Sequence, residues 1–64
     1  MDETIAALNR LIDMEREEIG KLERGERLWE LRGEDVTDDM LAKAKARVAR
    51  YEEAIALVAR QTNP

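Results

Sequence analysis

The sequence predicts an all-α fold, a two-helix antiparallel coiled-coil hairpin, and three observations predict it. Of the 64 residues, 41% are charged and only 3% are aromatic, a composition typical of long helices and coiled coils. Apolar residues recur at alternating spacings of three and four, which places them along one side of a helix. A short stretch at 33–37, rich in acidic residues and opening with Gly33, divides this pattern in two.

The first helix is expected over about residues 3–32. Its apolar seam consists of Ile5, Leu8, Ile12, Ile19, Leu22 and Trp29, and the same seam includes Glu15 and Glu26. Gly20 and Gly25 are discordant, because each costs about 1 kcal/mol relative to Ala inside a helix. We interpret Gly25 as a point of close approach by another backbone. The alternative is a break near Gly25 that gives three helices.

The turn is expected at 33–37 and the second helix over about 38–61. Gly33 suits the left-handed conformation that follows the end of a helix. Thr37 is a good N-cap, and Asp38 and Asp39 would face the positive end of the next helix. The whole chain, 1–64, is therefore predicted to be a single domain.

The second helix continues the seam, and the short connection makes the two helices antiparallel neighbours. Its seam consists of Leu41, Ala44, Val48, Tyr51, Ile55 and Val58. In this register Trp29 lies near Leu41 and Ala44, where a large residue fills the space beside small ones. We predict that Trp29 is a core plug, and the alternative is a platform on which a ligand stacks.

More apolar residues are present than one hairpin can cover. A chain of 64 residues buries only about 60% of its unfolded surface, and without disulfides oligomerisation is the remaining means of stabilisation. We expect assembly into a four-helix bundle dimer or a larger helical oligomer, with the two-fold dimer favoured. The candidate oligomer interface consists of Leu11, Met14, Leu28, Ala42, Ala49 and Ala56.

The chain has no cysteine and no histidine, which removes thiolate chemistry, imidazole catalysis and the usual zinc sites. Carboxylate metal sites in helical bundles usually add a histidine. We therefore predict no enzyme activity, no catalytic residue, no cofactor and no metal. The charged residues of the two helices are expected to pair across the hairpin. The alternative is a site for a small anionic ligand, for which the candidate contacts are Arg24, Arg27, Trp29, Arg32, Arg47, Arg50 and Tyr51.

Two functional hypotheses follow from these patterns. The first is a non-enzymatic helical-hairpin interaction protein, an adaptor, regulator or inhibitor of the kind found in phages and mobile elements, that binds a protein partner. The alternative is an oligomeric binder that sequesters an anionic nucleotide-like ligand between subunits. A net charge of −4 disfavours general nucleic-acid binding. The chain lacks both an apolar stretch of about 20 residues and the layout of a signal peptide, so we expect a cytoplasmic protein without a membrane partner.

Overall fold

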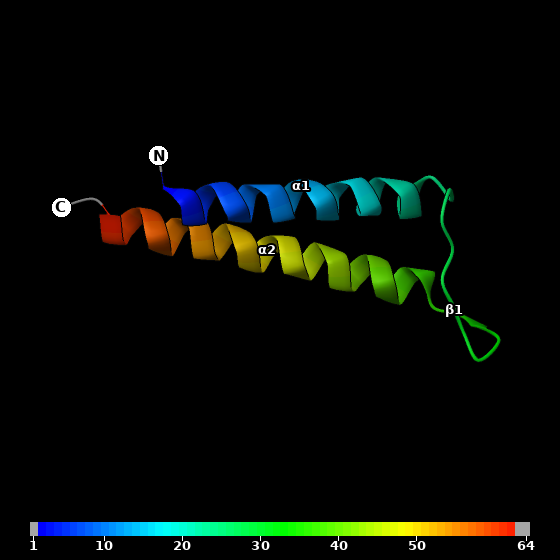
Figure 1. Cartoon of the computed structure of the whole chain (residues 1–64). Coiled ribbons are helices and arrows are strands. Elements are labelled where there is room, and N and C mark those ends of the chain that lie inside the picture. The colour runs from blue at the N-terminus through cyan, green and yellow to red at the C-terminus, as the bar shows by residue number, and fades with distance from the viewer. Residues whose placement is uncertain (1, 63–64) are drawn as a thin grey trace.

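The computed structural model of the chain is a helical hairpin, which confirms the predicted arrangement of two packed helices (Figure 1). It describes residues 2–62, with Thr62 through its backbone alone. The elements are α1 (Glu3–Glu23), β1 (Glu30–Leu31), β2 (Glu34–Asp35) and α2 (Thr37–Thr62). The molecule is 52 Å long and 15 Å in each other direction. The expected domain of 1–64 also includes Met1, Asn63 and Pro64, which lie outside the described residues.

Helix α1 begins at an aspartate cap and ends nine residues before the predicted position. The Asp2 carboxylate accepts hydrogen bonds from the backbone N–H groups of Thr4 at 2.8 Å and Ile5 at 3.3 Å. At the other end, Gly25 has a φ of 72°, and its N–H donates to the Leu22 carbonyl at 3.2 Å. This bond and the positive φ are features of a helix-ending motif that glycine adopts at little cost. The prediction of a helix over 3–32 is therefore wrong beyond Glu23.

A small β-hairpin replaces the predicted last turns of the first helix. Strands β1 and β2 are antiparallel, with Glu30 opposite Asp35 and Leu31 opposite Glu34. The two residues that join them, Arg32 and Gly33, have φ values of 53° and 82°, the signature of a two-residue type I′ turn. Gly33 therefore has the predicted left-handed backbone, but it serves the hairpin rather than a helix end. The chain does break at Gly25, although no third helix forms there. The interpretation of Gly25 as a point of close backbone approach is wrong, because no atom beyond its chain neighbours lies within 4 Å of the position that a Cβ would take; its positive φ is what requires glycine.

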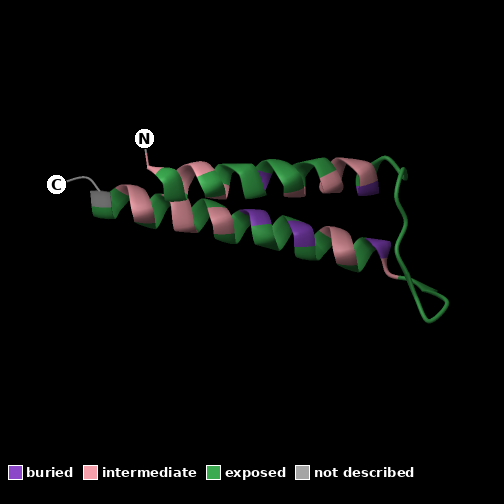
Figure 2. Ribbon diagram, in the orientation of Figure 1, coloured by how far each residue is buried: buried purple, intermediate pink, exposed green. Residues whose placement is uncertain are grey.

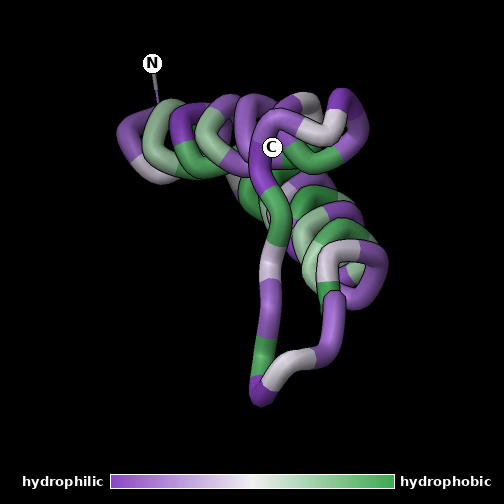
Figure 3. The backbone as a smooth tube through the Cα atoms, turned by 90° about the vertical axis from the view of Figure 1, so that its right-hand side faces the viewer, coloured by the Kyte–Doolittle hydropathy of each residue, from purple (hydrophilic) through white to green (hydrophobic). Residues whose placement is uncertain are grey.

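We call residues 24–36 the connector. It projects beyond the ends of the helices (Figure 1) and extends to one side of them (Figure 3). Its far end is fixed to the start of α2. The Val36 carbonyl accepts the first helical hydrogen bond, from the Met40 N–H at 3.0 Å, so Val36 rather than Thr37 is the N-cap. The buried Thr37 hydroxyl instead accepts the Trp29 N–H at 3.0 Å. The prediction that Thr37 caps the helix is thus wrong, because its side chain makes a tertiary contact.

The core lies between the helices, where both seams meet (Figure 2). The buried apolar residues of the described chain are Ile12, Leu22, Ala44 and Val48. The remaining apolar seam residues of α1 and α2 are partly buried, as the spacing predicted. Trp29, however, is 41% exposed and belongs to neither helix. The prediction that it is a core plug is wrong, since the break at Gly25 takes residue 29 out of the seam.

Candidate functional site

Two carboxylates of α1, Glu15 and Glu18, organise the polar side chains on one flank of the hairpin. The Arg47 guanidinium, from α2, donates to both oxygens of Glu15, from Nε at 2.8 Å and from Nη2 at 3.1 Å. Glu18 accepts from Arg27 Nη1 at 3.3 Å and from the Trp29 indole Nε1 at 3.4 Å. We call these five residues the Glu15–Glu18 network. It joins α1 to α2 and folds the connector back onto α1.

The bond from Arg47 Nε to Glu15 is the shortest of this network, at 2.8 Å. The pKa of Arg47 is raised, first because its guanidinium hydrogen-bonds to Glu15 and further by the negative charge of Glu15 and by Tyr51 nearby. Two parallel N–H bonds to one carboxylate also fix orientation, as a single contact does not. The Arg47 side chain is 45% exposed, so the pair adds at most about 1 kcal/mol of stability. Its main effect is to hold the two side chains in one orientation between α1 and α2.

The predicted arginine cluster does not converge on an open anion site. Arg24 pairs with Glu26 at 2.6 Å, Arg27 with Glu18 at 3.2 Å, and Arg47 with Glu15. Each of these guanidinium groups already has a carboxylate where a ligand anion would bind. Arg32 lies at the exposed turn of the connector. Of these three pairs only Arg47–Glu15 crosses the hairpin as predicted, and none of the three leaves a guanidinium group free for a shared anion pocket.

Arg50 and Tyr51 complete the set of candidate ligand contacts, and they differ in exposure and in their contacts with other charged groups. Tyr51 is partly buried on the seam and lies close enough to Arg47 to contribute to the raised pKa of that guanidinium. Arg50 is exposed and forms no ion pair within the part of the chain that the structure describes. It is thus a cation whose charge is available to another molecule.

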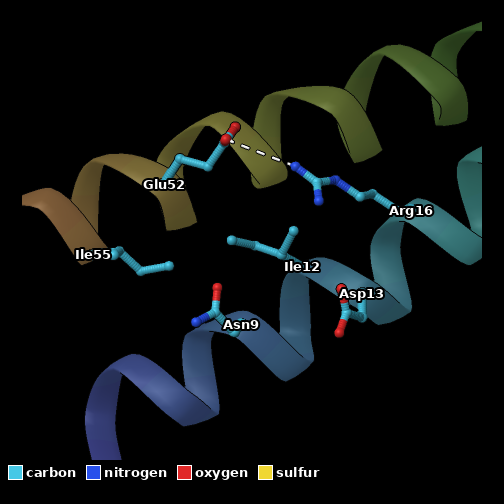
Figure 4. Close-up of a pocket in the computed structure, with 6 residues that line it drawn as sticks. All are labelled: Asn9, Ile12, Asp13, Arg16, Glu52 and Ile55. Atoms are coloured by element: carbon cyan, nitrogen blue, oxygen red, sulfur yellow. Dashed lines mark ion pairs between the residues drawn. The ribbon is translucent and has the colours of Figure 1, made fainter. Parts of the chain in front are cut away.

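The opposite flank holds a shallow groove that the sequence did not predict (Figure 4). It is lined by Asn9, Ile12, Asp13, Arg16, Glu52 and Ile55. Its volume of about 250 Å³ is below the range of about 300 to 1,000 Å³ that is usual for ligand sites. The spacing of Asn9, Asp13 and Arg16, which are three or four residues apart, was the available signal, but only the fold brings Glu52 to the other side.

An ion pair between α1 and α2 spans this groove. Arg16 and Glu52 approach to 3.8 Å while both side chains stay more than half exposed. Among the described residues, no group of three or more acidic, histidine or cysteine side chains is arranged to hold a metal ion. The groove is therefore a gap between two exposed side chains rather than a built binding site.

The six candidate interface residues are all exposed but do not form one surface. Leu11 and Met14 each lie one turn before a carboxylate of the Glu15–Glu18 network, on the same side of α1. Ala49 follows Arg47 by two residues, which places it about 200° around α2 from that flank. Ala42 and Ala56 share its side by their seven-residue spacing, and Leu28 lies in the connector.

Several large apolar side chains are well exposed to solvent. Six of them in the described residues are between 40% and 68% exposed, namely Leu11, Met14, Leu28, Trp29, Leu31 and Leu57. Three of the six lie in the connector and three on the helices. The exposed apolar side chains are thus more numerous than the four apolar residues that are buried.

Comparison with protein-family models, with curated proteins and with solved structures finds no match to this chain. Within the described residues, neither helix is long and apolar enough to cross a membrane. Inferences about function therefore start from the exposed apolar surface and from the charges beside it.

Proposed function

We propose that the chain is a non-enzymatic interaction protein, a helical hairpin that acts through protein–protein contacts as an adaptor, regulator or inhibitor. The observation that carries this proposal is the set of six large apolar side chains that are 40% to 68% exposed. Contiguous exposed apolar surface on a small protein usually marks an interface. Leu11 and Met14 share one side of α1 by their spacing, and Leu28, Trp29 and Leu31 lie within four residues of the connector. A protein partner can cover such a surface, whereas a small ligand needs a concave site.

Self-association is part of the proposal. With four buried apolar residues in the part of the chain that the structure describes, the core of a single hairpin is marginal, and a second copy stabilises such a fold by covering apolar surface that water would otherwise contact. A dimer of hairpins, a four-helix bundle, is the simplest assembly of this kind. The cytoplasmic location remains a prediction.

The alternative, a binder of an anionic nucleotide-like ligand, has less support. Such a site needs several free guanidinium groups that converge with an aromatic ring. Arg24, Arg27 and Arg47 are each bound to a carboxylate of the same chain. The Trp29 indole N–H, at 3.4 Å from Glu18, is also occupied.

Two measurements on the purified chain separate the two proposals. Light scattering over a range of micromolar concentrations should give a mass above that of one chain, and a thermal-shift series with nucleoside mono-, di- and triphosphates should leave the melting temperature unchanged. A monomeric mass throughout, together with a large stabilisation by one nucleotide, would replace the interaction proposal with the alternative.

A further inference from the structure

The flank that carries Arg47 and Glu15 is divided along its length into a charged half and an apolar half. On α1, Leu11 and Met14 precede Glu15 and Glu18 by four residues, so they continue the same flank toward the chain termini. The two apolar side chains are 40% and 66% exposed. The two carboxylates lie nearer the connector.

Helix α2 shows the same division. Lys43, Arg50 and Leu57 are seven residues apart, so they form one row along the helix. Ala54 follows Arg47 by seven residues and continues a parallel row. The cations are near the connector, and Leu57, which is 54% exposed, is near the termini. Both helices therefore carry the paired and free charges of this flank nearer the connector and its large exposed apolar groups nearer the termini, where Arg10 and Glu53 lie at its outer margin.

The charges on the flank are unevenly paired. Arg47 is bound by Glu15, but Lys43 and Arg50, on either side of it, form no ion pair within residues 2–62. The Glu18 carboxylate, on α1, makes longer contacts, at 3.2 to 3.4 Å, with Arg27 Nη1 and Trp29 Nε1. The acidic side chains of the flank are on α1 and its unpaired positive charges are on α2. The flank is therefore complementary in charge to the same flank of a second copy, provided that α1 of one copy faces α2 of the other.

We propose that a second copy of this chain covers the Arg47 flank, with both connectors at the same end and α1 of each protomer packed on α2 of its partner. The inference rests on the proposed function, since it names the partner and the face. A two-fold axis parallel to the helices keeps each residue at its own level and exchanges α1 with α2. Apolar half then meets apolar half, and acidic α1 meets basic α2.

The levels along the hairpin support this match. Ile12 and Ile55 line the same groove and Arg16 pairs with Glu52, which places Leu11 at the level of Leu57 and Glu18 at the level of Arg50. In the proposed dimer, Leu11 lies beside the partner's Leu57, and Arg50 beside the partner's Glu18. If fully overlapping copies had their connectors at opposite ends, Leu11 and Met14 would instead face the charged half, where apolar burial would desolvate unpaired charge.

The first test compares two leucine substitutions by light scattering. Leu57→Glu places a carboxylate in the apolar half of the flank and should raise the dimer dissociation constant by about tenfold or more. Leu31→Glu makes the same change at a position that is 61% exposed in the connector and should leave the dimer intact. Circular dichroism verifies that both variants keep their helices.

The second test measures which ends lie together. The chain has no cysteine, so Glu34→Cys in the exposed strand β2 gives one spin label per protomer. Pulsed electron paramagnetic resonance should find the two labels no further apart than about twice the 15 Å width of a hairpin, and not near its 52 Å length.

The outcomes separate this inference from the broader one. A dimer with a label distance near the full length, or one that Leu57→Glu leaves intact, overturns the arrangement but keeps self-association. A monomeric wild-type chain overturns the arrangement and the self-association together. Loss of the dimer in Leu57→Glu alone, with a short label distance in the wild-type background, supports the arrangement.

Discussion

The apolar spacing of the first helix continues into the connector, yet only the helices bury the apolar side chains that follow it. Leu22 is 5% exposed, whereas Trp29, one heptad later and in the same phase, is 41% exposed. Between them lies Gly25 with its positive φ, which ends α1 and turns the chain out of the helical path. Spacing therefore specifies a buried face only while the backbone stays helical, and one residue that ends the helix cancels the pattern beyond it.

The largest loss of stability is expected from a substitution at Ala44, in the helical region. It is 1% exposed in the middle of the helical core, so Ala44→Asp buries a carboxylate without a partner, at a cost of about 3 kcal/mol or more. A domain of this length has only about 3 to 10 kcal/mol of stability in total. We expect the helical signal in circular dichroism to be largely lost at 25 °C.

Ala46→Asp is the matched control, since it puts the same side chain on an exposed position of the same helix. It should stay folded. If both variants kept the same melting temperature, the core would not lie where α1 and α2 meet.

The next largest effect concerns the residue that separates the two regions. At Gly25, with a φ of 72°, alanine requires a left-handed backbone and should cost about 1 to 2 kcal/mol. At Gly20, inside α1, alanine should gain up to about 1 kcal/mol. A Cβ at Gly20 would meet only the guanidinium end of Arg24, at 2.9 Å, and that flexible side chain can move.

Denaturant unfolding of Gly25→Ala and Gly20→Ala gives the two free energies directly. A helix that continued through Gly25 would be stabilised by both substitutions. Equal increases in the free energy of unfolding would therefore show that the first helix continues past Gly25, as the apolar spacing predicted.

Most of the fold could be predicted from the sequence, because its rules are local. The seam spacing gives both helices, and the acidic residues at 38 and 39 mark the start of α2, where the structure has them in the first turn. The connector could not be predicted in this way. Its two strands contain two residues each, which is too short for an alternating pattern, and the arginine in its type I′ turn is not the residue that usually marks such a turn.

The candidate site was predictable only in part. That charged residues of the two helices pair across the hairpin was predicted from the sequence, and the contact between Arg47 and Glu15 is such a pair. The contact of Trp29 and Arg27 with Glu18 depends on how the connector folds back. No rule based on spacing along one helix could place residues 27 and 29 beside residue 18, because they do not belong to that helix.

The third prediction concerns Trp29 and sharpens the contrast with the core. A fully buried tryptophan costs about 3 to 5 kcal/mol when it is replaced by alanine. Trp29 is 41% exposed, and its backbone N–H bond to Thr37 does not need the ring, so Trp29→Ala should cost only about 1 kcal/mol. If chemical denaturation showed that Trp29→Ala lowers the free energy of unfolding by about 3 kcal/mol or more, the Trp29 ring would have to be buried in the core.

The smallest effect is the pH response of the connector at Asp35. Its carboxylate accepts the Thr37 N–H at 2.9 Å, and hydrogen bonds from Thr37 lower the pKa of Asp35 below its usual value of 3.8. Because the folded pKa is lowered, the contribution to stability is present above the usual value and is lost as the pH falls through the folded one. Asp35→Asn keeps an acceptor oxygen but cannot titrate in this range. Every other ionisable residue is the same in both proteins, so the difference in melting temperature between wild type and Asp35→Asn should shrink from pH 6 to pH 2.5. A difference that stays constant over that range would show that the Asp35 carboxylate does not hold the start of α2.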